Sequence, residues 1–144
     1  MQNLAENFIS KPLRWLFIVG LIYAWAPLAH AANYVVTQNF SADGSPHFPG
    51  VNGRTNRLYV SDTTAGTVTM FDAATGAKLA ETATGAGAHT VMVDELNNLV
   101  YVTNRGANTL SVLDGKTNNK LADIAVGSLP HGLDLDLINK RAYV

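Results

Sequence analysis

The chain repeats itself at an interval of 42 residues, and this feature constrains its fold more than any other. When residues 45–86 are aligned with residues 87–128 without a gap, 14 of the 42 positions are identical. The same interval separates His47, His89 and His131, and it also separates Tyr59, Tyr101 and Tyr143. A third copy begins at Leu129 and runs to Val144. A repeat of this length is a supersecondary unit that must stack on its neighbours to bury its apolar side.

Each repeat consists of short apolar or alternating runs. In residues 87–128 four such runs are rich in Val, Leu, Ile, Thr and Tyr, and polar or Gly-containing turns separate them. The runs are Thr90–Val93, Leu99–Thr103, Thr109–Leu113 and Leu121–Val126. Four strands in a repeat of this length predict an all-β fold, a β-propeller with four-stranded antiparallel blades. About two and a half blades are expected, because the chain holds two whole repeats and part of a third.

The repeats divide the chain into five segments. We expect a signal peptide, a leading strand with a linker, a first blade, a second blade and a third blade that is cut inside its second strand. These segments are residues 1–31, 32–44, 45–86, 87–128 and 129–144. The leading strand is expected at Tyr34–Thr37, which is a short β-branched and aromatic run.

The first segment has the features of a secretory leader. Lys11 and Arg14 precede an uncharged run from Trp15 to Ala29, and Ala29-His30-Ala31 supplies the small residues that a signal peptidase prefers. We therefore expect cleavage after Ala31 and a periplasmic or secreted protein, with no membrane contact after cleavage. The alternative is an uncleaved anchor, since the run extends almost to the length of a spanning helix.

Composition excludes several classes of function. Lys and Arg number 10 against 11 Asp and Glu, so the chain lacks the basic surplus of a nucleic-acid binder. The chain contains no cysteine, which excludes disulfides, thiolate nucleophiles and thiolate metal sites. Any chemistry is left to His, Asp, Glu, Ser and Thr. No cofactor is required by the sequence.

Three stretches of the second and third repeats resemble the YVTN family of β-propeller repeats. They are Tyr101–Asn104 (YVTN), Asn108–Asp114 and Val126–Gly132. The first repeat departs from the family pattern at Ser61 and Asp62, and Pro-His-Gly is complete only around His131. The resemblance implies an exported, YncE-like, seven-bladed propeller, in a group that also looks like lactonase-type and quinoprotein-type propellers.

The number of repeats leads to an expectation about the whole protein. Closed propellers use at least four blades, so we expect the 144 residues to be an N-terminal fragment of a longer propeller. The alternative is a short protein that closes its ring by oligomerising.

Several repeated polar residues are assigned to turns. An aspartate that opens a turn accepts backbone N–H groups across the bend, and Gly76 or Asn118 supplies the positive φ that two of these turns need. The turn residues are Asp72, Thr75, Asp94, Asp114, Thr117 and Asp136.

Three histidines are the first candidates for a ligand or metal site. His47, His89 and His131 are expected just before the innermost strands of successive blades, near the propeller axis, where imidazoles could coordinate copper or zinc. The alternative is a structural role, in which each histidine bonds to a Thr or Asn of its own blade, for instance His89 to Asn104. We favour the structural role and assign no metal.

Asp134 is a further candidate, because it lies on an expected innermost strand and interrupts the repeat, where Met92 is its counterpart. Its carboxylate could hold a cation or polarise a water beside the channel, although a solvated carboxylate is the favoured reading. Four arginines in or beside turns are weaker candidates for an anion-binding face. They are Arg54, Arg57, Arg105 and Arg141.

Two functions remain open at this point. The favoured one is a non-catalytic, exported scaffold whose loops at one end bind a small molecule, a polysaccharide or a protein. The alternative is a lactonase-like or a quinone- or metal-dependent enzyme with a site on the propeller axis. No catalytic residue is assigned from the sequence.

Overall fold

The computed structural model describes residue 42 and residues 44–144. The predicted leader in residues 1–31 and the predicted leading strand Tyr34–Thr37 lie outside the described residues. The described part of the chain is all-β and contains no helix long and apolar enough to cross a membrane.

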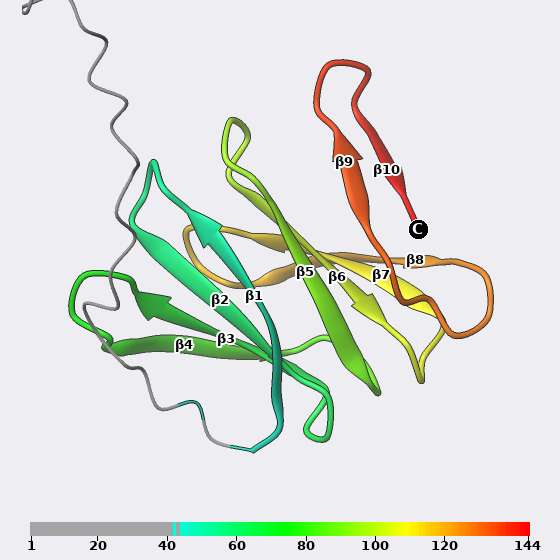
Figure 1. Ribbon diagram of the computed structural model, residues 1–144, viewed down its shortest axis with the longest axis horizontal. Coiled ribbons are helices and arrows are strands. Elements are labelled where there is room, and N and C mark those ends of the chain that lie inside the picture. The colour runs from blue at the N-terminus through cyan, green and yellow to red at the C-terminus, as the bar shows by residue number, and fades with distance from the viewer. Residues whose placement is uncertain (1–41, 43) are drawn as a thin grey trace, which may run out of the picture. The chain divides into compact units, whose positions relative to one another are not determined.

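In the described residues ten strands make two four-stranded sheets and one hairpin, and every pairing is antiparallel (Figure 1). The first sheet has the order β1-β2-β3-β4, the second has the order β5-β6-β7-β8, and β9 pairs with β10. The strands are β1 (Pro46–Asn52), β2 (Arg57–Asp62), β3 (Thr67–Asp72), β4 (Lys78–Ala83), β5 (Ala88–Asp94), β6 (Leu99–Asn104), β7 (Thr109–Asp114), β8 (Lys120–Ala125), β9 (Asp134–Asp136) and β10 (Arg141–Tyr143). The four strands predicted for the second repeat are therefore confirmed as β5 to β8.

A shared apolar core lies between the two four-stranded sheets. One face of the first sheet contributes Tyr59, Val68 and Met70, and the facing side of the second sheet contributes Val91 and residues of β6 and β7. The buried cluster is Tyr59, Val68, Met70, Ala88, Val91, Val100, Val102 and Leu113. Alternate residues of each strand point to one face of a sheet, so the period-two pattern of the sequence supplies this packing.

Close approach of the two sheets depends on a glycine in β1. A Cβ atom added to Gly50 would lie 2.8 Å from Val91 Cγ1 and 3.1 Å from Val93 Cγ2. Any side chain at this position would therefore push the innermost strands β1 and β5 apart.

Polar bonds also cross between the sheets. Tyr59 Oη donates to the carbonyl oxygen of Gly115 at 2.5 Å, and Asn118 Nδ2 donates to the carbonyl oxygen of Val68 at 3.0 Å. Asn118 adopts a φ of 61° and its counterpart Gly76 a φ of 75°, so the predicted positive φ at both turns is confirmed. Asn118 thus shapes its own turn and binds the neighbouring sheet.

The outermost strands carry charged pairs along their exposed edges. Lys78 Nζ lies 2.7 Å from Glu81 Oε2 in β4, and Lys120 Nζ lies 2.7 Å from Asp123 Oδ2 in β8. Charged residues on an edge strand discourage pairing with the strand of another molecule.

Candidate functional site

The candidate histidines gather at one end of the sheets, which we call the histidine end. It is the end where β1 and β5 begin. In the first sheet, Pro46 lies opposite Asp62, and Asp62 lies opposite Thr67. The opposite end, where Asn52 faces Arg57 and Arg57 faces Asp72, is called the turn end.

Imidazoles from three successive repeats form a stack that we call the histidine column. The ring centroids of His47 and His89 are 4.1 Å apart, and those of His89 and His131 are also 4.1 Å apart. The planes are tilted by 40° and 51°, respectively. The Phe48 ring extends the group, with its centroid 5.0 Å from that of His47 and 5.1 Å from that of His89. The sequence interval of 42 residues therefore becomes ring-to-ring contact.

β-Bulges set the directions of two of these rings, those of His47 and His89. The expectation that the histidines precede the innermost strands holds for His131, whereas His47 and His89 are each the second residue of a strand. Both lie where the register of the strand shifts. The shifts fall between Pro46 and Pro49 in β1 and between Ala88 and Val91 in β5. A bulge bends a strand locally and redirects its side chains, which is how an innermost strand presents an imidazole to its neighbour.

A hydroxyl group on the second strand of each sheet connects one repeat to the next. Ser61 Oγ accepts the N–H of Phe48 at 3.1 Å and donates to the carbonyl oxygen of His89 at 2.5 Å. In the second sheet, Thr103 Oγ1 accepts the N–H of Thr90 at 3.1 Å and lies 3.5 Å from the carbonyl oxygen of His131. We call this arrangement the hydroxyl latch.

The hydrogen bonds around Thr90 fix the tautomer of His89. Thr90 Oγ1 donates its one proton to the carbonyl oxygen of His131 at 2.6 Å, so it can only accept from His89 Nδ1, which lies 3.2 Å away. Neutral His89 therefore carries its proton on Nδ1 and leaves Nε2 unprotonated. A hydrogen bond to one ring nitrogen commonly sets the tautomer in this way.

His89 is the buried member of the column, with 3% of its surface exposed. Burial lowers its pKa below the usual value, and the neighbouring charges of His47, His131 and Arg105 lower that pKa further, against an opposing hydrogen bond to the His131 carbonyl. The surroundings of His89 thus favour a neutral ring.

The predicted hydrogen bond from His89 to a Thr or Asn of its own blade is confirmed for a threonine only. A threonine of the same sheet, Thr90, takes the role, whereas the suggested partner Asn104 does not bond to the ring. Asn104 Nδ2 donates instead to Thr109 Oγ1 at 2.9 Å and to Ser111 Oγ at 2.7 Å. Asn104 is fully buried, and these local acceptors across the β6–β7 turn satisfy its Nδ2, whereas its Oδ1 has no hydrogen-bond partner in the described residues.

Residues 44–144 contain no cluster of three or more His, Asp or Glu side chains that could hold a metal ion. The imidazoles instead contact one another as tilted rings. Asp134 stays exposed at the start of β9, and its Oδ1 accepts the N–H of Leu135 at 2.8 Å. Gly50, its counterpart in the first repeat, faces Val91 of the next sheet, so this repeat position points toward a neighbouring sheet.

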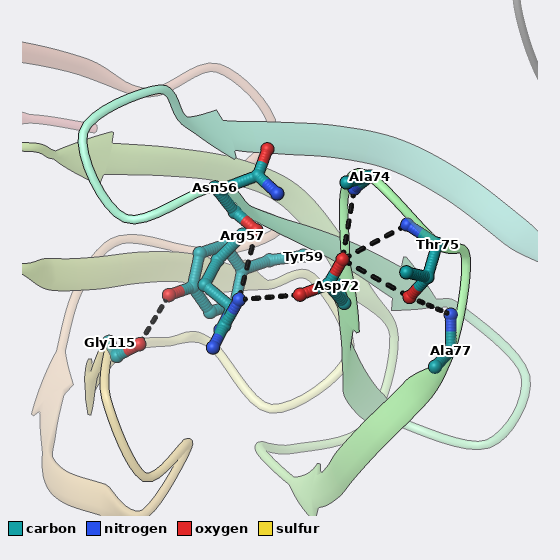
Figure 2. A network of polar contacts seen from close by, with 8 residues as sticks. All are labelled: Asn56, Arg57, Tyr59, Asp72, Ala74, Thr75, Ala77 and Gly115. Carbon is teal, nitrogen blue, oxygen red and sulfur yellow. Dashed lines mark hydrogen bonds and ion pairs between the residues drawn. The ribbon is translucent and has the colours of Figure 1, made fainter.

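The predicted turn residues hold the turn end. Asp72 Oδ1 accepts the N–H groups of Ala74 and Thr75, each at 3.0 Å, and the hydroxyl of Thr75 at 3.1 Å (Figure 2). Arg57 Nη1 binds Asp72 Oδ2 at 3.0 Å, so this arginine is engaged within its own sheet. The backbone N–H of Thr75 is the main cause of a lowered pKa at Asp72.

The other turn aspartates follow the same pattern. Each accepts the backbone N–H groups two and three residues ahead, and the side chain three residues ahead adds a third bond. They are Asp94 with Asn97, Asp114 with Thr117, and Asp136 with Asn139. These carboxylates are occupied by structural bonds.

We expect Asp94→Ala to lower the free energy of unfolding by about 1 kcal/mol, because two backbone N–H groups and the Asn97 amide lose their acceptor. Urea denaturation measures this loss. Asp94→Asn is the matched control, since its amide oxygen can still accept the turn N–H groups, and most of the stability should return. An equal loss in both variants would contradict the turn role.

A series of hydrogen-bonded side chains, which the sequence analysis did not predict, joins β7 to β8. Ser111 Oγ donates to Asp123 Oδ1 at 2.5 Å, and Lys120 Nζ binds Asp123 Oδ2 at 2.7 Å. The first repeat has the same series with other residues, namely Thr69, Glu81 and Lys78. The hydroxyl of Ser111 is fully buried, so a dissolved substrate could not reach it as a nucleophile. The alignment of Lys78 with Lys120 was the available signal.

A cavity of about 430 Å³ lies between the second sheet and the β9–β10 hairpin. Its walls include Leu99, Tyr101, Leu110 and Ile124, and none of the three imidazoles of the histidine column lines it.

Comparison with known proteins identifies the architecture. No family model matches the chain, and no curated protein matches it. Among solved structures, hydrazine synthase of Kuenenia stuttgartiensis is 24% identical with a TM-score of 0.66, over 77% of this chain and 32% of that chain. Hydrazine synthase and the other solved structures that match the chain are β-propeller proteins. The chain has a β-propeller fold.

Other solved propellers match with lower identity. Dihydro-heme d1 dehydrogenase NirN, in complex with DHE, is 22% identical with a TM-score of 0.54, over 59% of this chain and 18% of that chain. Apo AztD of Citrobacter koseri is 19% identical with a TM-score of 0.56, over 64% of this chain and 26% of that chain. The chain thus spans about a third or less of the propeller proteins that it matches. Its two four-stranded sheets are blades, and β1 and β5 are their innermost strands.

Proposed function

We propose that this chain belongs to an exported propeller of the YVTN, YncE-like type that acts as a binding scaffold, with its ligand at the histidine end. A small molecule, a polysaccharide or a protein is the class of partner we infer, and export to the periplasm or beyond follows from the predicted leader. The solved neighbours support the propeller fold, and the motif at Tyr101–Asn104 supports the family.

One observation carries the choice of face. Bulges and hydroxyl latches bring His47, His89 and His131 together with Phe48 at one end, and Phe48 keeps 39% of its surface exposed there. At the turn end, by contrast, the aspartate carboxylates accept hydrogen bonds from their own turns. These aspartates are Asp72, Asp94, Asp114 and Asp136. Loops and strand ends on a rigid scaffold are the usual place for recognition.

Binding at the histidine end is tested by backbone amide NMR while panels of metabolites, oligosaccharides and peptides are added. A ligand should shift the amide signals near Phe48, Thr90 and His131 and leave those around Asp72 unchanged. We expect Phe48→Ala to weaken binding about tenfold, since aromatic anchors that become buried on binding are among the few residues that dominate an interface.

The matched control is Leu137→Ala, which removes a side chain of similar exposure, 41%, from the β9–β10 turn at the turn end. This variant should bind like the original chain. Amide signal shifts confined to the turn end would contradict a binding site at the histidine end. Chemical turnover of a bound compound would contradict the scaffold hypothesis and favour an enzyme.

A further inference from the structure

The histidine column is a contact between blades, because each of its imidazoles comes from a different repeat. His47 belongs to the first blade, His89 to the second, and His131 to the connection that leads into β9. With centroids 4.1 Å apart, the rings touch directly. The hydroxyl latch holds the backbone beside them, so ring contact and latch close the same seam.

Positive or protonatable groups surround the central ring. His89 faces His47 of β1 on one side and His131 on the other, and Arg105 acts on it from the β6–β7 turn. A Cβ atom added to Gly87 would lie 3.5 Å from Arg105 Cβ, which places this arginine against the connection into β5.

Within the described residues no carboxylate forms a hydrogen bond or ion pair with the column. Asp62, the carboxylate at the histidine end of the first blade, accepts the backbone N–H groups of Ser45, Thr64 and Ala65 instead. Asp134 is exposed on β9, and its carboxylate accepts the N–H of Leu135. Among the described residues, no carboxylate is therefore paired with a charge that arises on the imidazoles.

A second proton on this column has an electrostatic cost. Two imidazolium rings at the observed spacing repel each other, and a charge on the buried central ring also loses its hydration. Both costs disappear when the rings separate and water surrounds them.

We propose that the histidine column is an acid-sensitive joint between blades, closed while its imidazoles are neutral and opened at the histidine end when more than one of them is protonated.

The direction of the pH dependence follows from His89. Burial, together with the neighbouring His47, His131 and Arg105, lowers its pKa in the closed state. The opened state therefore binds protons more readily. The closed joint has its full stability above the ordinary histidine pKa of about 6.5 and loses stability as the pH falls below that value.

Hydrogen exchange of single backbone amides in the full chain tests the joint. The N–H groups of Phe48 and Thr90 bond to the latch hydroxyls, and the reference is the N–H of Asn118, which bonds to the Asp114 carbonyl at the turn end. After correction for intrinsic exchange, we expect opening at Phe48 and Thr90 to rise about tenfold between pH 7.5 and 5.0. Opening at Asn118, which lies at the turn end away from the imidazoles, should change less than about twofold.

The double variant His47→Phe with His131→Phe isolates the cause. It keeps aromatic rings at both exposed ends of the column and removes their ionisable protons, so the acid-dependent rise at Thr90 should become smaller, while the burial of His89 preserves part of it. Arg54→Gln removes a cation at the turn end and should leave the rise intact. An undiminished rise in the double variant would overturn the proposal, and so would equal opening of Phe48, Thr90 and Asn118 in the original chain.

Discussion

Leu113→Ala is expected to lower the free energy of unfolding by about 2–5 kcal/mol. Leu113 has no exposed surface and lies in the core between the two blades, where it packs with Tyr59 and Val68. Alanine removes this apolar contact and leaves a cavity that two close-packed sheets can fill only in part. Urea denaturation monitored by circular dichroism measures the loss.

Leu121→Ala is the matched control for this substitution. Leu121 lies on β8, the outermost strand of the same blade, and 58% of its surface is exposed. Its removal should change the stability by no more than about 0.5 kcal/mol. Equal losses in the two variants would show that the face bearing Leu113 does not hold the blades together.

Tyr59→Phe is expected to lower the free energy of unfolding by about 1–3 kcal/mol, although it removes one oxygen atom. The Tyr59 hydroxyl donates to the carbonyl oxygen of Gly115 in the next blade, and phenylalanine would leave that buried carbonyl without this donor. Burial also raises the pKa of Tyr59, with Arg57 opposing and Asp114 adding to the rise. The folded chain should therefore lose stability above pH about 10, and the variant should lose less there.

The repeat itself supplies the control, Tyr101→Phe. Tyr101 is the counterpart of Tyr59, but within the described residues its hydroxyl forms no hydrogen bond, so this variant should keep nearly full stability. Thermal unfolding of the two variants side by side makes the comparison. If Tyr101→Phe cost as much as Tyr59→Phe, the bond to Gly115 would not be the cause.

Local features of the sequence could be predicted because they need only local information. Strand alternation places β5 to β8, and an aspartate such as Asp114 at the end of an apolar run indicates a turn whose N–H groups it accepts. The positive φ of Asn118 follows from the same reasoning.

The contacts between repeats could not be predicted in the same way. The latch joins Ser61 to the carbonyl of His89, 28 residues away, and its counterpart is Thr103, so the aligned position conserves a hydroxyl group but not a residue. A search for identical residues passes over that similarity. The role suggested for Asn104 failed because nearer hydroxyls, on Thr109 and Ser111, were available to its amide.

The bulges were hidden for a related reason. A shift in register depends on how two strands pair, and an alternating pattern shows only that each strand has two faces. The stacking of His47 on His89 follows from the bulges and the latch together, so the interval between the histidines indicated a shared location but not ring contact.

The hydroxyl latch has a consequence for how such a chain can grow. Each of the two whole repeats carries the donor on its second strand, and the acceptor is the carbonyl oxygen of the histidine near the start of the next repeat, so the donor of one copy meets the acceptor of the next. Tandem duplication of one 42-residue unit would therefore copy both halves of the junction at once, and the new boundary would match the old ones without further mutation. In repeat architectures, where each unit contacts only its neighbours, this interchangeability lets gene length change in whole units while every junction stays intact.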